Sequence, residues 1–189
     1  AAITGIVGAH RYIVTVEGKQ NHVGGSPMHM RYDALTGASE MILEFESLCR
    51  GGDGTSSLIG TVGKINVEPN EITIIPGKVT FSFDIRSLDA DLLAKTIDRF
   101  KEKAGDIATE RHLAVHFKNL TELDPVHVEP EIQEIIEQAC SSVDKTVSMQ
   151  CGASHDACQI AKIAPIGMIL VPSKGGRSHC PEEWTDYDD

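Results

Sequence analysis

The chain has little positive charge and contains no long apolar run. Its 17 lysines and arginines are outnumbered by 28 aspartates and glutamates, which gives a formal net charge of −11. A nucleic-acid-binding surface needs clustered cations to neutralise phosphates, so this charge argues against a nucleic-acid partner. No apolar stretch approaches the ~20 residues that cross a bilayer, so no membrane partner is predicted either.

The cysteines lack the spacing of a metal site or a disulfide framework. They number 5, an odd count, and no two stand in a CxxC arrangement. This usage is typical of reduced thiols in the cytoplasm rather than of a secreted, disulfide-linked protein. Hydrophobic residues make up 41% of the chain and charged residues 24%, which is the balance of a folded globular protein.

The first two thirds of the chain alternate between strand and helix patterns. Period-two alternation and β-branched residues predict strands, and apolar residues about 3.6 apart predict helices. The predicted elements are a strand at 11–18, a helix at 27–49, strands at 58–67 and 78–86, a helix at 89–107 and a strand at 113–117. Ser26 is expected to cap the first helix, with Pro27 as its first residue, and Asp89 to cap the second.

The order β-α-β-β-α-β over 8–118 predicts a ferredoxin-like unit, in which two helices cover one face of an antiparallel sheet. The outer sheet face or an edge strand is left for a partner. The segment 119–189 differs, with predicted helices at 131–140 and 155–163. An apolar run at Ile166–Val171 predicts a strand buried on both faces. These elements are too few for a separate core, so 119–189 is expected to be part of a larger α/β domain.

Two polar residues of the first unit are candidates for function. His22 lies in the loop before the first helix, where functional side chains collect; a solvated turn histidine is the alternative. Arg86 closes the polar face of the alternating strand, as either a surface ion-pair partner or a clamp for a carboxylate. His112 and His116 are rejected as a metal pair, because four residues of strand separate them by ~13 Å.

Two glycine-rich segments near the C-terminus carry one candidate histidine each. His155 lies within 152–157, and His179 within 175–185. A histidine in such a loop can reach a metal ion or a substrate. His179 follows the apolar run, at the end of a strand where open α/β sheets place ligands. Zinc takes three or four protein ligands, so His179 alone does not establish a metal site. Either the protein holds no metal, or the other ligands lie outside this chain.

Four ordered blocks resemble the M20-type metallo-amidohydrolases. The blocks are 14–34, 75–86, 152–157 and 178–185. The closest resemblance is to the branch of N-carbamoyl-L-amino-acid hydrolases, allantoate amidohydrolases and β-ureidopropionases. It implies an α/β catalytic domain that holds two divalent metal ions (zinc, manganese, cobalt or nickel), with the β-α-β-β-α-β unit inserted as a dimerisation domain. The segment 119–189 would then be the C-terminal portion of the catalytic domain, with the N-terminal portion absent.

The resemblance also implies a role for each candidate residue. His22 would reach the active site of a partner subunit and polarise the scissile carbonyl. Arg86 would hold the substrate carboxylate, His155 would line the substrate pocket, and His179 would be the final metal-binding histidine. Thr73 stands where the family usually has a substrate-contacting asparagine. Its hydroxyl cannot replace the separate donor and acceptor of an amide, so substrate preference or activity is expected to differ.

The implied reaction is hydrolysis of a linear ureido or amide C–N bond in an N-carbamoyl-L-amino acid or a related ureido acid such as allantoate or ureidopropionate. The enzyme would be a cytoplasmic homodimer acting on a small molecule, and the isolated chain would be inactive. Two alternatives stay open. One is a non-catalytic dimerisation module or truncated remnant, and the other is an M20 exopeptidase or aminoacylase.

Overall fold

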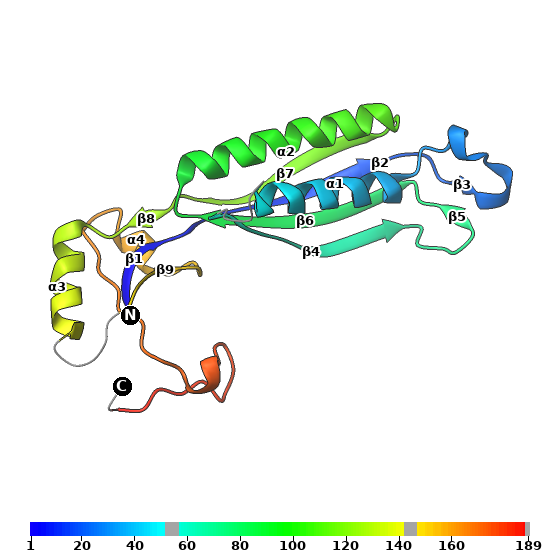
Figure 1. Cartoon of the computed structure of the whole chain (residues 1–189). Coiled ribbons are helices and arrows are strands. Elements are labelled where there is room, and N and C mark those ends of the chain that lie inside the picture. Colours follow the sequence, from blue (N-terminus) through cyan, green and yellow to red (C-terminus); the bar gives the residue numbers. More distant parts are fainter. Residues whose placement is uncertain (52–56, 142–146, 188–189) are drawn as a thin grey trace. The chain divides into compact units, whose positions relative to one another are not determined.

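The computed structural model describes residues 1–51, 57–141 and 147–187, which form two compact units (Figure 1). We call Gly8–Pro125 the sheet unit, and Ala1–Val7 together with the described residues from Val126 onward the terminal unit. The sheet unit begins where the first domain was predicted to begin. It extends past residue 118 to Pro125 because its last strand continues to Leu123. Within the described ranges, no helix is both long and apolar enough to cross a membrane.

The sheet unit contains four antiparallel strands in the order β4-β6-β2-β7. In chain order its main elements are β2 (Gly8–Glu17), α1 (Ala34–Arg50), β4 (Ile59–Glu68), β6 (Lys78–Ser87), α2 (Ala90–Glu110) and β7 (Ala114–Leu123). Both helices cover the same face of the sheet (Figure 1). The predicted β-α-β-β-α-β order is therefore confirmed. We call the opposite face of the sheet the open face.

The core of the sheet unit lies between the sheet and the two helices. Along β6, buried apolar residues alternate with half-buried polar ones, as the period-two pattern predicts. Phe83 is central, since its ring centroid lies 5.0 Å from Tyr12, 4.8 Å from Phe45 and 5.2 Å from Phe100. Aromatic pairs at these separations add about 0.5–1.5 kcal/mol each beyond the burial of their area. This cluster anchors both helices to the sheet.

The terminal unit has a smaller sheet of three strands, in the order β8-β1-β9. Its elements are β1 (Ala2–Ile6), β8 (Val126–His127), α3 (Pro130–Ser141), β9 (Ser148–Cys151), α4 (Ala157–Ile160) and the 3₁₀ turn η3 (Lys174–Gly176). The central strand β1 pairs antiparallel with β8 and parallel with β9. The buried core is a short set of residues: Ile3, Ile6, Cys151, Ile166 and Met168.

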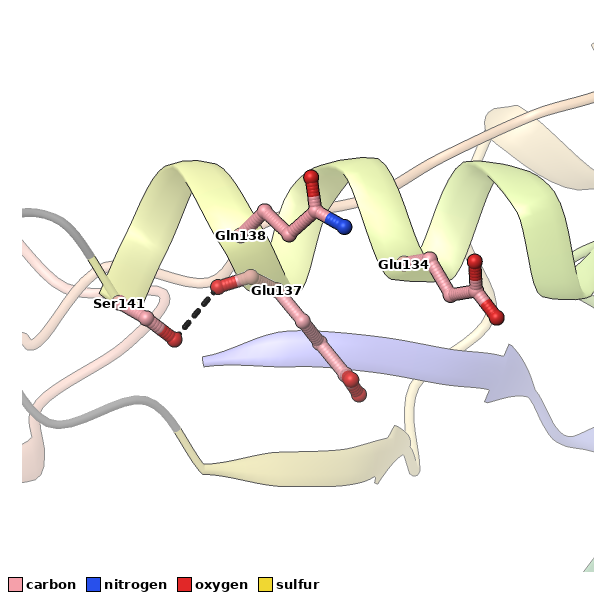
Figure 2. A pocket seen from close by; sticks show the side chains of 4 residues that line it. All are labelled: Glu134, Glu137, Gln138 and Ser141. Atoms are coloured by element: carbon pink, nitrogen blue, oxygen red, sulfur yellow. Dashed lines mark hydrogen bonds between the residues drawn. The ribbon is translucent and has the colours of Figure 1, made fainter.

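Helix α3 carries a shallow hollow of about 450 Å³, lined by Glu134, Glu137, Gln138 and Ser141 (Figure 2). Hydrogen bonds from the Ser148 hydroxyl and then from the Gln133 amide lower the pKa of Glu137. The Ser141 hydroxyl donates to the Glu137 backbone carbonyl, at 2.6 Å. The lining residues come from one helix, and none of the candidate residues lies among them. The hollow is the solvated surface of a helix.

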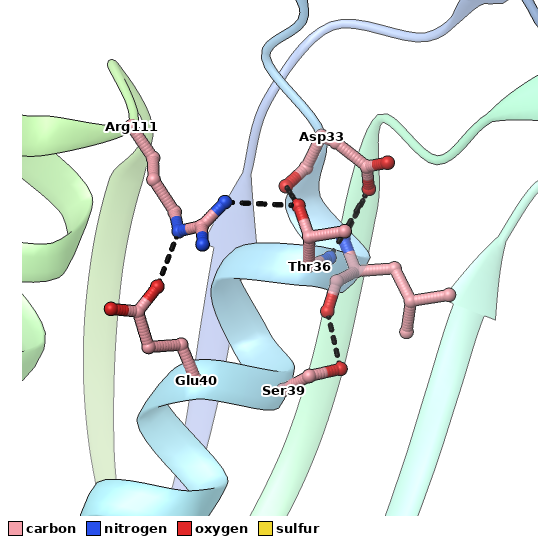
Figure 3. Close-up of polar contacts among 6 residues, drawn as sticks. Asp33, Thr36, Ser39, Glu40 and Arg111 are labelled. Atoms are coloured by element: carbon pink, nitrogen blue, oxygen red, sulfur yellow. Dashed lines mark hydrogen bonds and ion pairs between the residues drawn. The ribbon is translucent and has the colours of Figure 1, made fainter. Parts of the chain in front are cut away.

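The first helix begins later than predicted. Two 3₁₀ turns, η1 (Val23–Gly25) and η2 (Met28–Met30), precede α1. The extended backbone of Pro27 (φ −54°, ψ 148°) and Arg31 (φ −85°, ψ 138°) interrupts the helical pattern. The N-cap is Asp33, whose carboxylate accepts hydrogen bonds from the amides of Leu35 (2.9 Å) and Thr36 (3.2 Å), so the prediction of Ser26 as the cap is wrong (Figure 3).

The second helix begins as predicted, because the Asp89 carboxylate accepts from the Leu92 amide at 2.9 Å. Its far end is tied back to α1. Arg111, the residue after α2, forms an ion pair with Glu40 and donates to the Thr36 hydroxyl (Figure 3). Together, the two helix ends and the aromatic cluster hold α1 and α2 side by side on the sheet.

Two predictions for the terminal unit are wrong. The helix predicted at 155–163 is reduced to α4, a single turn followed by hydrogen-bonded turns. The predicted strand at Ile166–Val171 forms a single bridge, between Ala2 and Ile169. Ile166 and Met168 are buried while Ile169 and Val171 are exposed, because one face of the segment packs on the small core. Apolar content alone had suggested burial on both faces.

Candidate functional site

His22 and Thr73 meet in a loop region of the sheet unit that we call the tip. Strand β3 (Asn21–His22) pairs with β5 (Ile74–Ile75), and His22 is opposite Ile74. The Val23 amide donates to the Thr73 carbonyl at 3.0 Å. Both candidate side chains are exposed. The structure thus brings together two residues that are far apart in the sequence, on segments linked by backbone hydrogen bonds.

The side chain of Arg31 donates hydrogen bonds to backbone carbonyls within the first loop of the tip. Its Nε donates to the Ser26 carbonyl at 2.9 Å, and its Nη2 donates to the Val23 carbonyl at 3.0 Å. These contacts hold the loop that carries His22 in a defined shape. The apolar side chains of Met28 and Ile72 are largely exposed at the same tip. The tip therefore combines an ordered backbone with an apolar, accessible rim.

The hydrogen bonding of His22 sets what its ring can do. Its Nδ1 accepts a hydrogen bond from the Gly24 amide at 3.1 Å. A ring nitrogen that accepts a hydrogen bond carries no proton, so the neutral ring holds its proton on Nε2. His22 therefore presents an N–H donor rather than a lone pair. Such a donor is suited to a carbonyl oxygen or an oxyanion.

His155 repeats this arrangement in the terminal unit. Its Nδ1 accepts from the Ala157 amide at 3.0 Å, at the start of α4, and the residue is exposed. Its neutral ring also presents Nε2–H. Both histidines are therefore arranged as hydrogen-bond donors to an oxygen-bearing ligand. In this tautomer neither ring offers a free nitrogen to a metal ion.

Among the residues that the structure describes, Arg86 lies in a cluster with Asp84 and Arg11 on the open face. Its Nε donates to Asp84 Oδ1 at 2.6 Å, and its Nη2 to Asp84 Oδ2 at 3.1 Å. Arg11, from the neighbouring strand β2, donates through Nε to the same Oδ2 at 2.7 Å. Burial tends to raise the pKa of Asp84, but the hydrogen bonds from Arg86 and Arg11 outweigh it and hold that pKa below its usual value. The carboxylate is therefore ionised at neutral pH.

Asp84 and Arg11 were not among the predicted candidates. Asp84 could have been found, since it shares the polar face of the alternating strand with Arg86. Arg11 could not, because its place opposite Asp84 depends on how β2 and β6 pair. Register between strands distant in sequence cannot be deduced from the alternation of either strand alone.

Arg86 lies far from the tip within the sheet unit. Arg86 pairs with Ala9, at the end of the sheet where β2 begins. Lys78 is the first residue of β6 and lies at the opposite end of that strand, the end that follows the tip in the chain. Strands rise ~3.3 Å per residue, so Lys78 and Arg86 are ~26 Å apart along β6. Within one copy of the chain, a small molecule held by Arg86 is out of reach of His22.

His179 is exposed and lies in a tight turn of the terminal unit. Its backbone adopts φ 58°, and its amide donates to Glu183 Oε2 at 2.8 Å. Among the described residues there is no group of three or more histidine, cysteine, aspartate or glutamate side chains that could hold a metal ion. His179 is thus accessible, but the described residues do not form a metal site by themselves.

Known proteins match the chain over nearly its whole length. It is 38% identical over 189 residues to the N-carbamoyl-L-amino-acid amidohydrolase of Paenarthrobacter aurescens. The matched segment covers 99% of this chain and 45% of that protein. It is 34% identical to the allantoate amidohydrolase of Bacillus subtilis strain 168, covering 97% of this chain and 44% of that protein. The chain therefore spans less than half the length of these relatives.

A solved structure extends the match to the fold. The amidase of the hydantoinase/carbamoylase family from Burkholderia multivorans superimposes with a TM-score of 0.89 at 30% identity, over 97% of this chain and 44% of that one. The profile of the peptidase dimerisation domain of M20 type matches residues 4–112. These matches confirm the resemblance carried by the four sequence blocks. Since the profile covers more than half of the chain, the chain belongs to the M20 peptidase dimerisation domain family.

Proposed function

We propose that this chain is part of a metal-dependent amidohydrolase that cleaves the ureido or amide C–N bond of N-carbamoyl-L-amino acids or related ureido acids such as allantoate and ureidopropionate. The observation that carries the proposal is the similarity to an N-carbamoyl-L-amino-acid amidohydrolase across 99% of the chain. The arrangement of donors and cations in the structure supports it, because the substrates of such an enzyme combine a carbonyl with a carboxylate.

In the proposed mechanism, His22 polarises the scissile carbonyl. Its Nε2–H, set by the hydrogen bond from Gly24 to Nδ1, donates to the carbonyl oxygen as negative charge develops there. Thr73 lies beside His22 and is proposed to contact the same substrate through its hydroxyl. The proposed role of His155 is to donate a second hydrogen bond to the substrate, through its own Nε2–H.

Arg86 is proposed to bind the substrate carboxylate at a site on the open face. A guanidinium can hold a carboxylate through two parallel hydrogen bonds, which fixes the position of the substrate as well as its charge. The pairing with Asp84 keeps the guanidinium in one orientation.

We propose that the active protein is a homodimer, in which His22 of one copy and Arg86 of the other serve the same site. The separation of ~26 Å along β6 supports this, since one copy cannot bring both to a small substrate. Strand β4 is an edge of the sheet and contacts α1, and each of these elements has an exposed apolar residue, Leu43 in α1 and Ile65 in β4. An edge strand beside exposed apolar residues is suited to pairing with a second copy.

His179 is the residue of this chain that we propose as a metal ligand. The remaining ligands would come from parts of the protein outside this chain. A bound divalent ion, of zinc, manganese, cobalt or nickel, lowers the pKa of its water and polarises the substrate carbonyl. Two such ions are proposed for the whole enzyme.

The cytoplasm is the proposed location of the enzyme. All five cysteines are free in the part of the chain that the structure describes. Free thiols persist in a reducing compartment. Burial raises the pKa of the Cys49 thiol to about 11, which keeps it protonated and unreactive.

The proposal is tested by hydrolysis assays on the full-length protein. Release of ammonia from N-carbamoyl-L-amino acids, allantoate and ureidopropionate is measured with added manganese or zinc. Replacing His22 by alanine should lower kcat about 10²- to 10³-fold, because an oxyanion donor is lost. His22→Gln, which keeps an N–H close to the Nε2 position, should retain more activity than His22→Asn. His116→Ala, which changes an exposed histidine on the open face, is the control.

The same assays address the alternatives. An exopeptidase would hydrolyse dipeptides and leave the ureido compounds intact. A non-catalytic dimerisation module would act on neither class and would still dimerise. Near-normal kcat in His22→Ala would contradict the role given to His22, even if the protein hydrolyses the expected substrates.

A further inference from the structure

We propose that Arg31 selects the tautomer of His22, by holding the peptide unit between Val23 and Gly24 in one orientation. The inference rests on the proposed function, in which His22 donates from Nε2–H to the substrate. It goes beyond that function because it gives a positioning role to a residue that acts on His22 through the backbone.

One planar peptide unit connects Arg31 to His22. The carbonyl of Val23 and the amide of Gly24 belong to this unit, and they point in opposite directions because the peptide bond is trans. Arg31 Nη2 donates to the carbonyl at 3.0 Å. The amide donates to His22 Nδ1 at 3.1 Å. Arg31 and the ring of His22 are therefore bound to opposite ends of one rigid group.

The guanidinium of Arg31 is itself held in place. Its Nε donates to the Ser26 carbonyl at 2.9 Å, beside the bond from Nη2 to Val23. Because a guanidinium is planar, two hydrogen bonds to different carbonyls fix both its position and its plane. The Val23 amide in turn donates to the Thr73 carbonyl at 3.0 Å. The peptide unit next to His22 is thus supported from one side by a fixed cation.

The turn that contains this peptide unit has a second possible form. Val23 and Gly24 are the central residues of the turn from His22 to Gly25, which includes η1. Turning the central peptide over converts a type I turn into a type II turn, which requires φ above zero at the third residue and favours glycine there. That residue is Gly24, whose φ lies outside the left-handed region in the structure. The sequence therefore permits both forms, and a contact must select between them.

The two forms would present different rings to a substrate. In the observed form the Gly24 amide faces Nδ1, so the neutral ring of His22 carries its proton on Nε2. In the turned-over form the Val23 carbonyl would replace that amide and favour a proton on Nδ1. Nε2 would then be an acceptor, which cannot stabilise an oxyanion. The orientation of one peptide unit thus decides whether His22 can perform its proposed role.

Arg31 favours the observed form in two ways. Its hydrogen bond to the Val23 carbonyl is lost when the peptide turns over, and a hydrogen bond with one charged partner shifts an equilibrium about 10- to 100-fold. The positive charge also polarises the peptide, which strengthens the donation from Gly24 to His22. A purely structural role for Arg31, as a brace of the loop, makes a different prediction. It would weaken the loop without changing which nitrogen of His22 is protonated.

The test combines nitrogen NMR and kinetics on the full-length enzyme with isotope-labelled histidine rings. The signals of His22 are assigned by their absence in His22→Gln. Wild type should carry the proton on Nε2, and Arg31→Gln should show a mixture of the two tautomers. In Arg31→Gln, kcat for an N-carbamoyl-L-amino acid should fall about 3- to 30-fold, with KM changed less than about 3-fold. In the His22→Ala background the same change should alter kcat less than about 2-fold, because the residue through which Arg31 acts is missing.

Arg111→Gln is the matched control. Arg111 is, like Arg31, a half-buried arginine with a structural contact, but it binds Glu40 and Thr36 of α1 rather than the turn. Its replacement should leave the tautomer of His22 unchanged and kcat within about 2-fold of wild type.

Each outcome has a distinct meaning. A proton on Nδ1 in wild type, or a pure Nε2 tautomer in Arg31→Gln, would overturn the role of Arg31 and leave the proposed function standing. A mixture of tautomers with an unchanged kcat would overturn it as well. Failure of the wild type to hydrolyse any ureido substrate would instead overturn the proposed function, and the NMR measurement would still test the link between Arg31 and His22. If Arg31→Gln does not fold, Arg31→Lys decides: it keeps the charge without the planar fork, so a pure Nε2 tautomer there would overturn the role of Arg31.

Discussion

The sheet unit and the terminal unit differ in how far they bury their large apolar side chains. All 5 phenylalanines of the chain lie in the sheet unit, in its core or packed against it. There, strand alternation and two amphipathic helices point their apolar residues at one another. The sheet unit thus has the features of a region that builds its own core.

The terminal unit buries a short aliphatic set and leaves much of its apolar surface in solvent. Ile163 is 84% exposed and Trp184 is 54% exposed, and Val147 and Val171 are also exposed. Exposed apolar patches of this kind mark surfaces that contact other parts of a protein. One region of the chain thus builds a core from its own residues, whereas the other leaves much of its apolar surface exposed.

The largest effect that would test this comparison is expected at Phe83. Replacing it by alanine removes a ring that contacts Tyr12, Phe45 and Phe100. The free energy of unfolding should fall by about 3–5 kcal/mol, the range for large-to-small changes at buried aromatic positions. Urea unfolding followed by circular dichroism measures this loss.

Ile163→Ala in the terminal unit is the matched control for Phe83→Ala. Because Ile163 is exposed, its loss should change stability by less than about 0.5 kcal/mol. A cost comparable to that of Phe83→Ala, measured on this 189-residue chain, would show that Ile163 packs within the terminal unit itself. In that case the two units would not differ in the way described above.

A second, smaller effect concerns the charged cluster of the sheet unit. The pKa of Asp84 is lower in the folded chain than in the unfolded chain, so its stabilisation is present above the unfolded pKa of ~3.9 and is lost as pH falls through the folded pKa. Asp84→Asn should cost about 1–2 kcal/mol at pH 7, since hydrogen bonds to a charged group are lost. The cost should shrink as the pH falls below the unfolded pKa of ~3.9, because Asp84 is then protonated first in the unfolded chain and, at lower pH, in the folded chain as well.

The measurement is urea unfolding of wild type and Asp84→Asn at pH 7 and again near pH 3. Wild type should lose more stability than the variant as the pH falls. If the stability difference between wild type and Asp84→Asn is the same at both pH values, the ionised carboxylate does not contribute to stability. The charged cluster would then be a surface feature without a stabilising role.

The two units also differ in how far the sequence predicts their structure. In the sheet unit, strict alternation over 78–86 predicts β6, and Asp89 before an apolar 3.6-residue pattern predicts the start of α2; both predictions are confirmed. In the terminal unit, the apolar run at Ile166–Val171 misled, because a run of apolar residues does not say how many of its faces will be covered.

For the candidate residues, too, the sequence predicts what depends on local patterns and not what depends on contacts between distant segments. Local patterns made both residues candidates: His22 by its position in a loop, and Arg86 by its place on the polar face of an alternating strand. The pairing of His22 with the segment of Thr73, and that of Arg11 with Asp84, depends on strand register and could not be predicted from either segment alone. The roles given to these residues stay predictions until the variants are assayed.

The smallest expected effect compares the N-cap that the structure shows for α1 with the one that was predicted from the sequence. Asp33 accepts two backbone hydrogen bonds at the start of α1, so Asp33→Ala should cost about 1 kcal/mol. The Ser26 hydroxyl is buried and, within the described residues, has no hydrogen-bond partner. Ser26→Ala should therefore be neutral or stabilise by a few tenths of a kcal/mol, because a desolvated hydroxyl is removed. Thermal unfolding of both variants distinguishes them, and a larger loss for Ser26→Ala would mean that the helix begins at Pro27 as its sequence alone suggests.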